Sequence, residues 1–265
     1  MAYKILVVVR EVWDTRDLVA SPLDDNAAIK TDALETRFEP EDLNALEMAL
    51  RIKDNEDAEV VAISLGAPSD VDVLRESMYR GVDDVLRIEA DPRSLDTAAR
   101  AELIAAAIRQ RGEYNLLLVG TTIPDGDNGM LGTQLAATLG IDSVNWVDEL
   151  EEIAAGGVKA KRAIEMGYET VELPFPALLS VGVALLEDDP RAPRNAKAML
   201  KLKKKKEPIA TATAAELGID DPNANCSTKL AGFEPVEQRV VESKEIDAED
   251  GDALQAMLNE VLKGE

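Results

Sequence analysis

A polar, glycine-rich segment in the middle of the chain has residue types suited to binding an anion. It extends from Gly120 to Gly140 with the sequence GTTIPDGDNGMLGTQLAATLG. Thr121 and Thr122 bring hydroxyl groups that can donate hydrogen bonds to a diphosphate. Three glycines lack any side chain that would keep a phosphate away from the backbone: Gly126, Gly129 and Gly132. The segment therefore predicts a phosphate-binding turn, with simple turn capping by the threonines as the alternative.

The elements on either side of this segment favour the same hypothesis. Leu116–Val119 is an apolar run typical of a buried strand, and a leucine stripe with the i, i+4, i+8 spacing of a helix begins at Leu131. A turn from a strand to the start of a helix gathers unpaired backbone N–H groups and the positive end of the helix dipole. A strand–turn–helix joint without a ligand, N-capped by Asp127 or Asn128, is the alternative interpretation.

Apolar strand-like runs alternate with helix-like runs through the first half of the chain. The expected strands are Lys4–Val9, Val60–Leu65, Val85–Ile88, Leu116–Val119 and Val144–Val147. The expected helices are Pro40–Lys53, Ser69–Arg80 and Asp96–Gln110. This alternation predicts an α/β fold with a mostly parallel, doubly wound, Rossmann-like sheet of the adenine-nucleotide-binding kind. Ligands of such folds bind at the carboxyl ends of the strands.

The pattern changes after Asp148. Val158–Ile164 and Tyr168–Leu173 alternate apolar with polar residues and predict a β-hairpin inserted at about 149–175, before a buried strand over Pro176–Val183. We therefore expect a nucleotide- or flavin-binding domain over residues 1–189. Residues 190–265 are expected to form a docking loop and a C-terminal arm, with a terminal helix at Asp252–Lys263. The arm has few apolar residues, so we expect a partner chain to order it.

The composition argues against several classes of function. The 265 residues include 52 acidic and 29 basic side chains, for a net charge of −23, which disfavours nucleic acid and anionic lipid as partners. The chain has no histidine and one cysteine, which argues against a metal site of the zinc type, a disulfide framework and Ser-His or Cys-His catalysis. No apolar run reaches roughly 18 residues and no signal peptide is recognisable, so we expect a cytoplasmic protein without membrane insertion. We expect no catalytic side chain; a bound cofactor would carry any redox chemistry.

Several segments in order resemble one family. They are the opening KILVVVREVWDT, the helix EPEDLNALEMALRIK, the turn DGDNGMLG at Asp125–Gly132, the run AKRAIEMGYETVELPFPALLS at Ala160–Ser180, and the stretch DPRAPRNAKAMLKLKKKK. On these segments the chain resembles the β subunit of electron transfer flavoprotein over nearly its whole length. Ala160–Ser180 carries the most specific part of the likeness, a basic residue, an acidic-glycine turn, Glu169 and Pro176. Met166 and Ser180 depart from the family's signature there.

The resemblance implies a heterodimer with an α subunit and an adenine nucleotide bound in the central turn. In one branch of the family the nucleotide is AMP with a structural role. In the electron-bifurcating branch it is a second FAD, which takes a hydride from NADH and divides the electrons between ferredoxin or flavodoxin and the α-subunit FAD that serves a dehydrogenase. The residues that the resemblance and the turn together place at the cofactor are Val8, Val9, Glu39, Leu65, Gly66, Gly120, Thr121, Thr122, Asp125, Gly126, Asp127, Asn128, Gly129, Met130, Leu131, Gly132 and Thr133.

The turn resembles the FAD-binding branch more than the AMP-binding branch. Its DGD opening is similar to that branch, and Leu131 stands where AMP-binding members carry a threonine whose hydroxyl helps to hold the phosphate. Met130 replaces a glutamine that both branches share, and Glu39 replaces an asparagine. A carboxylate at Glu39 would repel a nearby phosphate unless it faced a ribose hydroxyl. FAD is therefore expected, with AMP or an altered nucleotide site as the alternatives.

A docking segment for a dehydrogenase is also implied by the resemblance. Its expected residues are Arg191, Pro193, Arg194, Asn195, Ala196 and Met199. Members that serve acyl-CoA dehydrogenases carry a protruding leucine where this chain has Asn195 and Ala196. The partner is therefore expected to be a different dehydrogenase or a larger permanent complex. A non-redox, adenine-nucleotide-binding regulatory domain is a further alternative, which the hairpin and the long arm disfavour.

Overall fold

The structure is a computed structural model. It describes residues 2–16, 23–24, 30, 34–66, 72–122, 129–154, 156–224, 226–229, 231 and 250–263.

The described residues form a mixed, mostly parallel sheet of nine strands in the order β11-β5-β4-β1-β6-β10-β7-β8-β9. The parallel strands are β1 (Tyr3–Val8), β4 (Ala58–Leu65), β5 (Asp84–Glu89), β6 (Leu116–Gly120), β10 (Ala177–Val181) and β11 (Ala210–Thr213). The antiparallel edge consists of β7 (Asp142–Ala154), β8 (Gly157–Ile164) and β9 (Gly167–Pro174). The expected mostly parallel α/β fold is confirmed.

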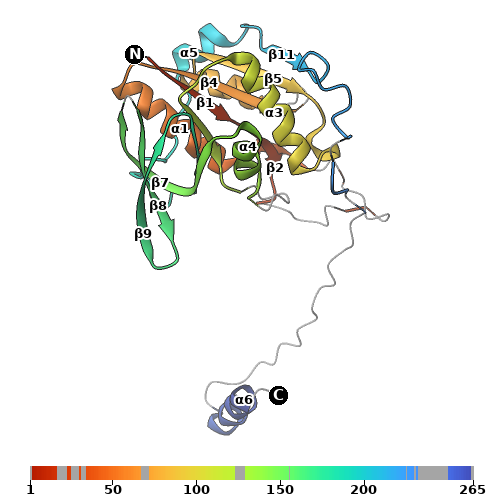
Figure 1. The fold of residues 1–265 in the computed structure, drawn as a ribbon. Helices are drawn as coiled ribbons and strands as arrows, with labels where there is room; N and C mark the ends of the chain where they lie inside the picture. Colours follow the sequence, from red (N-terminus) through yellow and green to blue (C-terminus); the bar gives the residue numbers. More distant parts are fainter. Residues whose placement is uncertain are drawn as a thin grey trace.

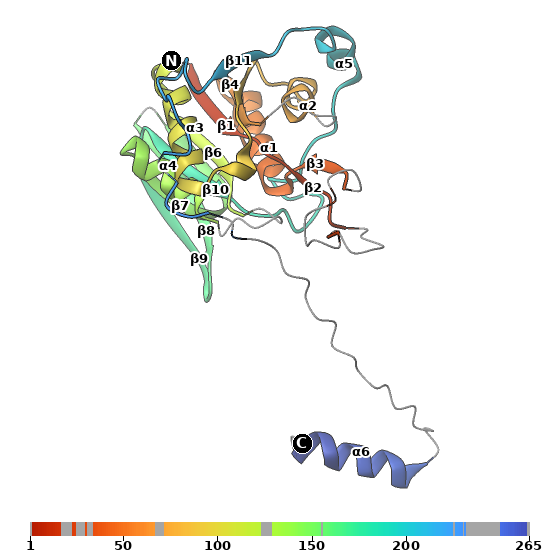
Figure 2. The same ribbon diagram turned by 90° about the vertical axis from the view of Figure 1, so that its right-hand side faces the viewer.

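Both faces of the sheet are apolar because the central strands are covered by helices on both sides. Ile5 and Val7 of β1 pack with helices α1 (Pro40–Asn55) and α2 (Val73–Arg80). Leu6 and Val8 pack on the opposite face with α3 (Thr97–Arg111) and α4 (Leu131–Leu139). Figure 2 shows α1 and α2 on one side of β1 and β6, and α3 and α4 on the other. The continuous apolar runs of the sequence reflect this double burial.

Aspartates cap the starts of α2 and α3, and glycines end α2, α3 and α4. Asp72 accepts a hydrogen bond from the amide of Arg75 at the start of α2, and Asp96 caps α3 in the same way. Gly81 ends α2, as predicted, with a φ of +126°. Helix α2 begins at Val73, with Asp72 as its N-cap, and not at Ser69 as predicted. Ser69 itself lies outside the described residues.

Strand β7 is much longer than the predicted Val144–Val147 because it pairs first with β10 and then with β8. Its first part lies parallel to β10, and its second part, from Val147, lies antiparallel to β8. An extra residue interrupts the pairing with β10, and Trp146 has a φ of +62° there. The predicted hairpin, β8 and β9, then extends the sheet away from the helices, as Figure 1 shows.

Two smaller elements lie outside the main layers. Strands β2 (Glu11–Trp13) and β3 (Thr36–Phe38) form an antiparallel pair, and a 3-10 turn covers Pro92–Ser94. Among the described residues, no helix combines the length and apolarity that crossing a bilayer requires.

Part of the segment beyond residue 190 folds onto the domain, which differs from the expected arm. Helix α5 (Ala198–Lys204) packs against α2, and β11 pairs in parallel with β5. Leu217 is buried in the core on the α3 side. Among the alanines and isoleucines between 209 and 219, Ile209, Ala212, Ala214 and Ile219 pack partly buried against the two hydrophobic cores. The predicted terminal helix is present as α6 (Gly251–Lys263), and its ordering against a partner stays a prediction.

Candidate functional site

The strand order reverses between β1 and β6, at the carboxyl ends of the two strands. From β1 the chain moves outward to β4 and β5 on one side, and then to β6 on the other. Helices α1 and α4, which follow these two strands along the chain, pack on opposite faces of the sheet, and the carboxyl ends of β1 and β6 mark the crevice where α/β proteins of this topology bind ligands. The N-terminus of α1 also lies over β6, with which it makes extensive contacts.

A buried ion pair occupies the floor of this crevice. The guanidinium of Arg10 contacts both carboxylate oxygens of Asp42, with Nε–Oδ2 at 2.7 Å and Nη2–Oδ1 at 2.9 Å. Asp42 also accepts a hydrogen bond from the amide of Gly120 at 2.7 Å, and Nη2 of Arg10 donates to the Gly120 carbonyl at 3.0 Å. The pair thus joins the ends of β1 and β6 to the first turn of α1, and each buried charge has a partner.

Gly120 has no side chain because α1 approaches the strand end at this point. A β-carbon at residue 120 would lie 2.7 Å from the amide nitrogen and Oδ1 of Asp42 and from Cβ of Glu41. Each of these distances is shorter than van der Waals contact allows. Gly120, which was expected at the cofactor, therefore leaves room for the first turn of α1.

Glu41 binds both donors of Thr122. The amide of Thr122 donates to Oε2 at 2.5 Å, and its hydroxyl donates to Oε1 at 3.0 Å. Glu41 is 5% exposed, and burial, the largest cause, raises the pKa of its carboxyl. The two Thr122 donors that the sequence assigned to a diphosphate are thus bonded to a carboxylate.

Glu39 is the N-cap of α1. Its Oε2 accepts a hydrogen bond from the amide of Asp42 at 2.6 Å, and its side chain is almost fully buried. Burial, and then the charge of Asp42, raise the pKa of Glu39 to about 8. At neutral pH the carboxyl is therefore largely protonated, which removes most of the repulsion expected between Glu39 and a bound phosphate.

The hydroxyl of Thr121 is a buried polar group without a hydrogen-bond partner among the described residues. The backbone of Thr121 is engaged, since its amide donates to the carbonyl of Val181 at 3.1 Å. Gly129 lies beside it with a φ of +72°, and a β-carbon there would be 3.1 Å from the carbonyl oxygen of Thr121. An orphaned buried hydroxyl costs about 1–3 kcal/mol unless a ligand or water satisfies it.

Helix α4 begins two residues after Gly129, which lies against the backbone of Thr121. Met130 is its N-cap, not Asp127 or Asn128, and within the described residues the Met130 side chain makes no capping hydrogen bond. Methionine has no oxygen acceptor to offer the first-turn N–H groups. Leu131 is buried in the core on the α3 side, so this residue can face a nucleotide only through its backbone.

The remaining residues of the predicted set have mixed positions. Gly132 packs against Ser180, whose hydroxyl leaves no room for a side chain, and the hydroxyl of Thr133 donates to the Met130 carbonyl at 2.9 Å. Val8, Val9 and Leu65 have buried side chains at the ends of β1 and β4, and Gly66 follows Leu65 at the same edge. Four predicted residues lie outside the described residues: Asp125, Gly126, Asp127 and Asn128.

These features fit the adenine nucleotide that the sequence resemblance implies, at the α4 side of the crevice. There the Thr121 hydroxyl needs a partner, Gly129 keeps the backbone bare, and the start of α4 has no side-chain cap among the described residues. The α1 side is different because Glu41 and Asp42 already use the donors of Thr122 and Gly120. The crevice therefore has one side suited to phosphate and one side that carries its own carboxylates.

The sequence analysis missed Arg10, Glu41 and Asp42 as members of the site. A signal for them existed: a charged residue directly follows the buried strand β1, and two acids occupy the first turn of α1. Both positions map to the carboxyl edge of a parallel sheet, where opposite charges must pair if they are buried.

The two arginines expected to dock a dehydrogenase are engaged within the chain. Arg191 is buried, and its guanidinium contacts Asp148 at 2.5 Å and Asp189 at 2.7 Å. Arg194 contacts Glu47 and Asp54 of α1, each at 2.7 Å. Both guanidinium groups hold the segment against the domain.

Other members of the docking set face outward. Pro193 and Asn195 are exposed, Ala196 is half-buried, and Met199 on α5 is 64% exposed. Leu202, three residues after Met199 on α5, is 81% exposed. The segment thus presents apolar side chains among the lysines of α5.

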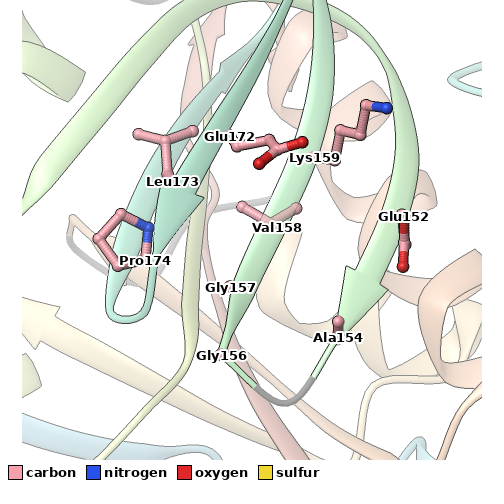
Figure 3. Close-up of a pocket in the computed structure, with 9 residues that line it drawn as sticks. All are labelled: Glu152, Ala154, Gly156, Gly157, Val158, Lys159, Glu172, Leu173 and Pro174. Carbon is pink, nitrogen blue, oxygen red and sulfur yellow. The ribbon is translucent and has the colours of Figure 1, made fainter.

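A pocket of about 540 Å³ lies among the edge strands β7, β8 and β9, away from this crevice (Figure 3). Its lining includes Lys159 between Glu152 and Glu172, which are its cross-strand neighbours. Gly157 is required there because a β-carbon would overlap the backbone of Leu173. None of the residues predicted to bind the cofactor lines this pocket.

Comparison with known proteins identifies relatives of the whole domain. The electron transfer flavoprotein domain family matches residues 27–217. The electron transfer flavoprotein subunit beta of Thermoanaerobacterium thermosaccharolyticum is 31% identical over 82% of this chain and 80% of that protein. The corresponding subunit of Clostridium acetobutylicum is 34% identical over 66% of this chain and 67% of its own length. Subunit CarD of the caffeyl-CoA reductase–Etf complex of Acetobacterium woodii is 32% identical over 71% of each chain.

Proposed function

The chain belongs to the electron transfer flavoprotein family, among relatives named as β subunits, and from that premise we propose that it binds FAD at the crevice between β1 and β6. In this proposal it forms a heterodimer with an α subunit and accepts electrons from NADH. It divides them between ferredoxin or flavodoxin and the α-subunit FAD, which serves a dehydrogenase. The working site of the heterodimer would be cytoplasmic.

The observation that carries the proposal is the unsatisfied hydroxyl of Thr121 beside the start of α4. Thr121 is 4% exposed and its Oγ1 has no partner among the described residues, while a β-carbon at Gly129, just before the N-cap of α4, would lie 3.1 Å from the Thr121 carbonyl oxygen. A phosphate oxygen would accept a hydrogen bond from this hydroxyl and would face the positive end of the helix dipole. A core threonine without a ligand would instead turn its hydroxyl to a backbone carbonyl.

The protein's own contribution is positioning. When bound, FAD supplies hydride acceptance and single-electron transfer through its ring system. The Arg10–Asp42 pair fixes the ends of β1 and β6 relative to α1, and Thr121 with the α4 start would hold phosphate oxygens. Glu39, held protonated at neutral pH by burial, would present an uncharged carboxyl beside the nucleotide. No side chain needs to act as a general acid or base.

Two observations favour FAD over AMP. Leu131 has no hydroxyl to offer a phosphate and its side chain is buried in the core. The Thr122 donors are bonded to Glu41, so a terminal phosphate finds fewer donors here than two free threonines would give. AMP with a structural role remains the second candidate, supported by the family match, which does not distinguish the two nucleotides.

The proposed partners follow from the relatives and from the surface. CarD is named as a subunit of a complex with a CoA-thioester reductase, which supports a dehydrogenase or reductase as the electron acceptor of this chain. Met199 and Leu202 on α5 supply exposed apolar side chains for that contact. The exposed apolar face of α6, with Leu258 and Val261, supports its ordering against the α subunit.

Extraction of the bound nucleotides from the intact, purified heterodimer tests the proposal. The complex is denatured, and the released nucleotides are separated and quantified against the protein. We expect two flavins per heterodimer and bleaching of the flavin absorbance by NADH. One flavin and one AMP would establish the second candidate, and a crevice that releases no nucleotide would contradict both.

A further inference from the structure

Resting on the proposed nucleotide site, we infer that Glu41 is a selectivity residue that disfavours a terminal phosphate dianion and so favours FAD over AMP. The Glu41 carboxylate takes the place of an external anion, because it accepts the hydrogen bonds of the Thr122 amide and hydroxyl on the α1 side of the crevice. The inference concerns a residue outside the set that the sequence assigned to the cofactor.

The geometry of Glu41 is that of a bound anion. Two neutral donors of one residue converge on its two oxygens, the Thr122 amide at 2.5 Å and the Thr122 hydroxyl at 3.0 Å. An amide and a hydroxyl at a strand end are the donors that a phosphate would otherwise take. Gly120 allows this approach, since a β-carbon there would lie 2.7 Å from Cβ of Glu41.

The charge of Glu41 is also less compensated than that of its neighbour. Asp42 is fully buried and both its oxygens contact the guanidinium of Arg10. The hydrogen bonds that Glu41 accepts come from the neutral groups of Thr122. Glu39 caps α1, where it bonds to the amide of Asp42. Of the three acids at the start of α1, Glu41 is therefore the one whose carboxylate holds the Thr122 donors that a phosphate would otherwise take.

The two candidate nucleotides differ in the charge of each phosphate. AMP ends in a monoester, which approaches two negative charges at neutral pH because its second pKa is about 6. Each phosphate of the FAD diphosphate is a diester-like group with one negative charge. Repulsion by a fixed carboxylate grows in proportion to the charge it faces, and it is strong where water is excluded. Glu41 therefore penalises AMP more than FAD, and adenosine hardly at all.

The experiment measures three affinities on the heterodimer after its β-site nucleotide has been removed. AMP, FAD and adenosine are titrated by calorimetry into the unmodified protein and into Glu41→Gln, which keeps the side-chain shape and the acceptor oxygen for Thr122. Glu149→Gln on β7 is the matched control, because it removes one carboxylate far from the crevice. In Glu41→Gln we expect AMP to bind about tenfold more tightly than in the unmodified protein. The affinity for FAD should increase by less than about threefold, and the affinity for adenosine should stay the same. Glu149→Gln should leave all three affinities unchanged.

Equal changes for AMP and FAD, or no change for either, would overturn the inference and leave the proposed nucleotide site intact. Absence of binding by all three compounds to the unmodified protein would overturn the proposed site, and the inference with it. Thermal denaturation checks that each variant is folded. Should Glu41→Gln prove unfolded, Glu41→Ala removes the same charge without a new polar group, and the same AMP-to-FAD shift is required of it.

Discussion

The carboxyl edge of the sheet and the segment that follows β10 both hold buried arginines, but they leave different groups unsatisfied. At the sheet edge, Arg10 pairs with Asp42, and a polar hydroxyl, that of Thr121, is left without a partner among the described residues. In the later segment, Arg191 and Arg194 are paired, and apolar side chains on α5 are left exposed. Under the proposed function, the first region would receive a polar ligand and the second an apolar surface of a partner.

In both regions an arginine side chain holds an irregular segment in place. A guanidinium that bonds two groups at once fixes a loop that has no regular structure of its own. Arg10 fixes the ends of β1 and β6 to α1, and Arg194 fixes the later segment to the same helix through Glu47. Helix α1 is thus the common support of the two regions, with its N-terminus at the crevice and its middle turns at the segment.

The largest expected effect comes from breaking the ion pair at the sheet edge. Asp42→Asn removes the negative charge that both Nε and Nη2 of the buried Arg10 guanidinium contact, and we expect the free energy of unfolding to fall by about 3–5 kcal/mol. Urea denaturation followed by circular dichroism measures this. Asp57→Asn, an exposed acid before β4, is the control and should change stability by less than about 0.5 kcal/mol. A loss below about 1 kcal/mol for Asp42→Asn would mean that the pair does not hold the crevice together.

The pH dependence of stability should have opposite signs at the sheet edge and in the later segment. The pKa of Glu39 is raised to about 8 from an ordinary value of 4.5, so the folded state binds a proton that the unfolded state has lost between these values. Stability from this group is full below about pH 4.5 and is lost as pH rises toward 8. Glu39→Gln should remove that part of the loss and gain about 1–3 kcal/mol over the unmodified protein at pH 8, with little difference at pH 5.

Denaturant midpoints at pH 5, 6.5 and 8 give this measurement. Carboxyl groups of the later segment behave in the opposite way, because Arg191 lowers the pKa of Asp189. Asp189→Asn should therefore destabilise the protein most at neutral pH and least in acid. Identical pH profiles for the two variants would contradict the contrast between the regions.

A smaller loss is expected when the later segment is released. Arg191→Met removes the contacts to Asp148 and Asp189, whose carboxylates retain some exposure to water. We expect a loss of about 1–2 kcal/mol, less than for Asp42→Asn, because water can solvate the acids that remain. Limited proteolysis should in addition cut the segment after residue 186 faster than in the unmodified protein. A loss as large as that of Asp42→Asn would make the two regions equivalent.

The sequence was sufficient to predict the layers but not the pairs of charges. Periodicity is local, so the apolar runs Leu116–Val119 and Val60–Leu65 indicated strands without knowledge of the rest of the chain. The contact of Arg10 with Asp42 spans 32 positions, and that of Asp42 with Gly120 spans 78. Such contacts depend on which helix start lies over which strand end.

The missed elements have the same explanation. Strand β11 has the sequence ATAT, whose small side chains give little hydrophobic alternation, and it is ordered by pairing with β5. Helix α5 carries three lysines and lies against α2, where the guanidinium of Arg75 donates to the carbonyl of Lys204. The docking residues were predicted from the family resemblance, which indicated the segment. It did not reveal that Arg191 and Arg194 form ion pairs with acids of the same chain.

The smallest expected change in stability belongs to the exposed face of α5, and it sharpens the comparison most. Met199→Ser and Leu202→Ser together replace side chains that are mostly in water, so the free energy of unfolding should change by less than about 0.5 kcal/mol. If this face docks the partner dehydrogenase, the same double variant should weaken that complex about fivefold or more, because exposed apolar anchors carry much of the binding energy at such contacts. The dissociation constant measured by surface plasmon resonance with the purified partner reports this loss, and Ile164→Ser on β8 is the matched apolar control. If the double variant and the unmodified heterodimer bind the partner equally well, these apolar side chains do not make the contact, and the lysines of α5 or the hairpin must make it. A loss of both stability and binding would mean that α5 belongs to the core of the domain and not to its surface.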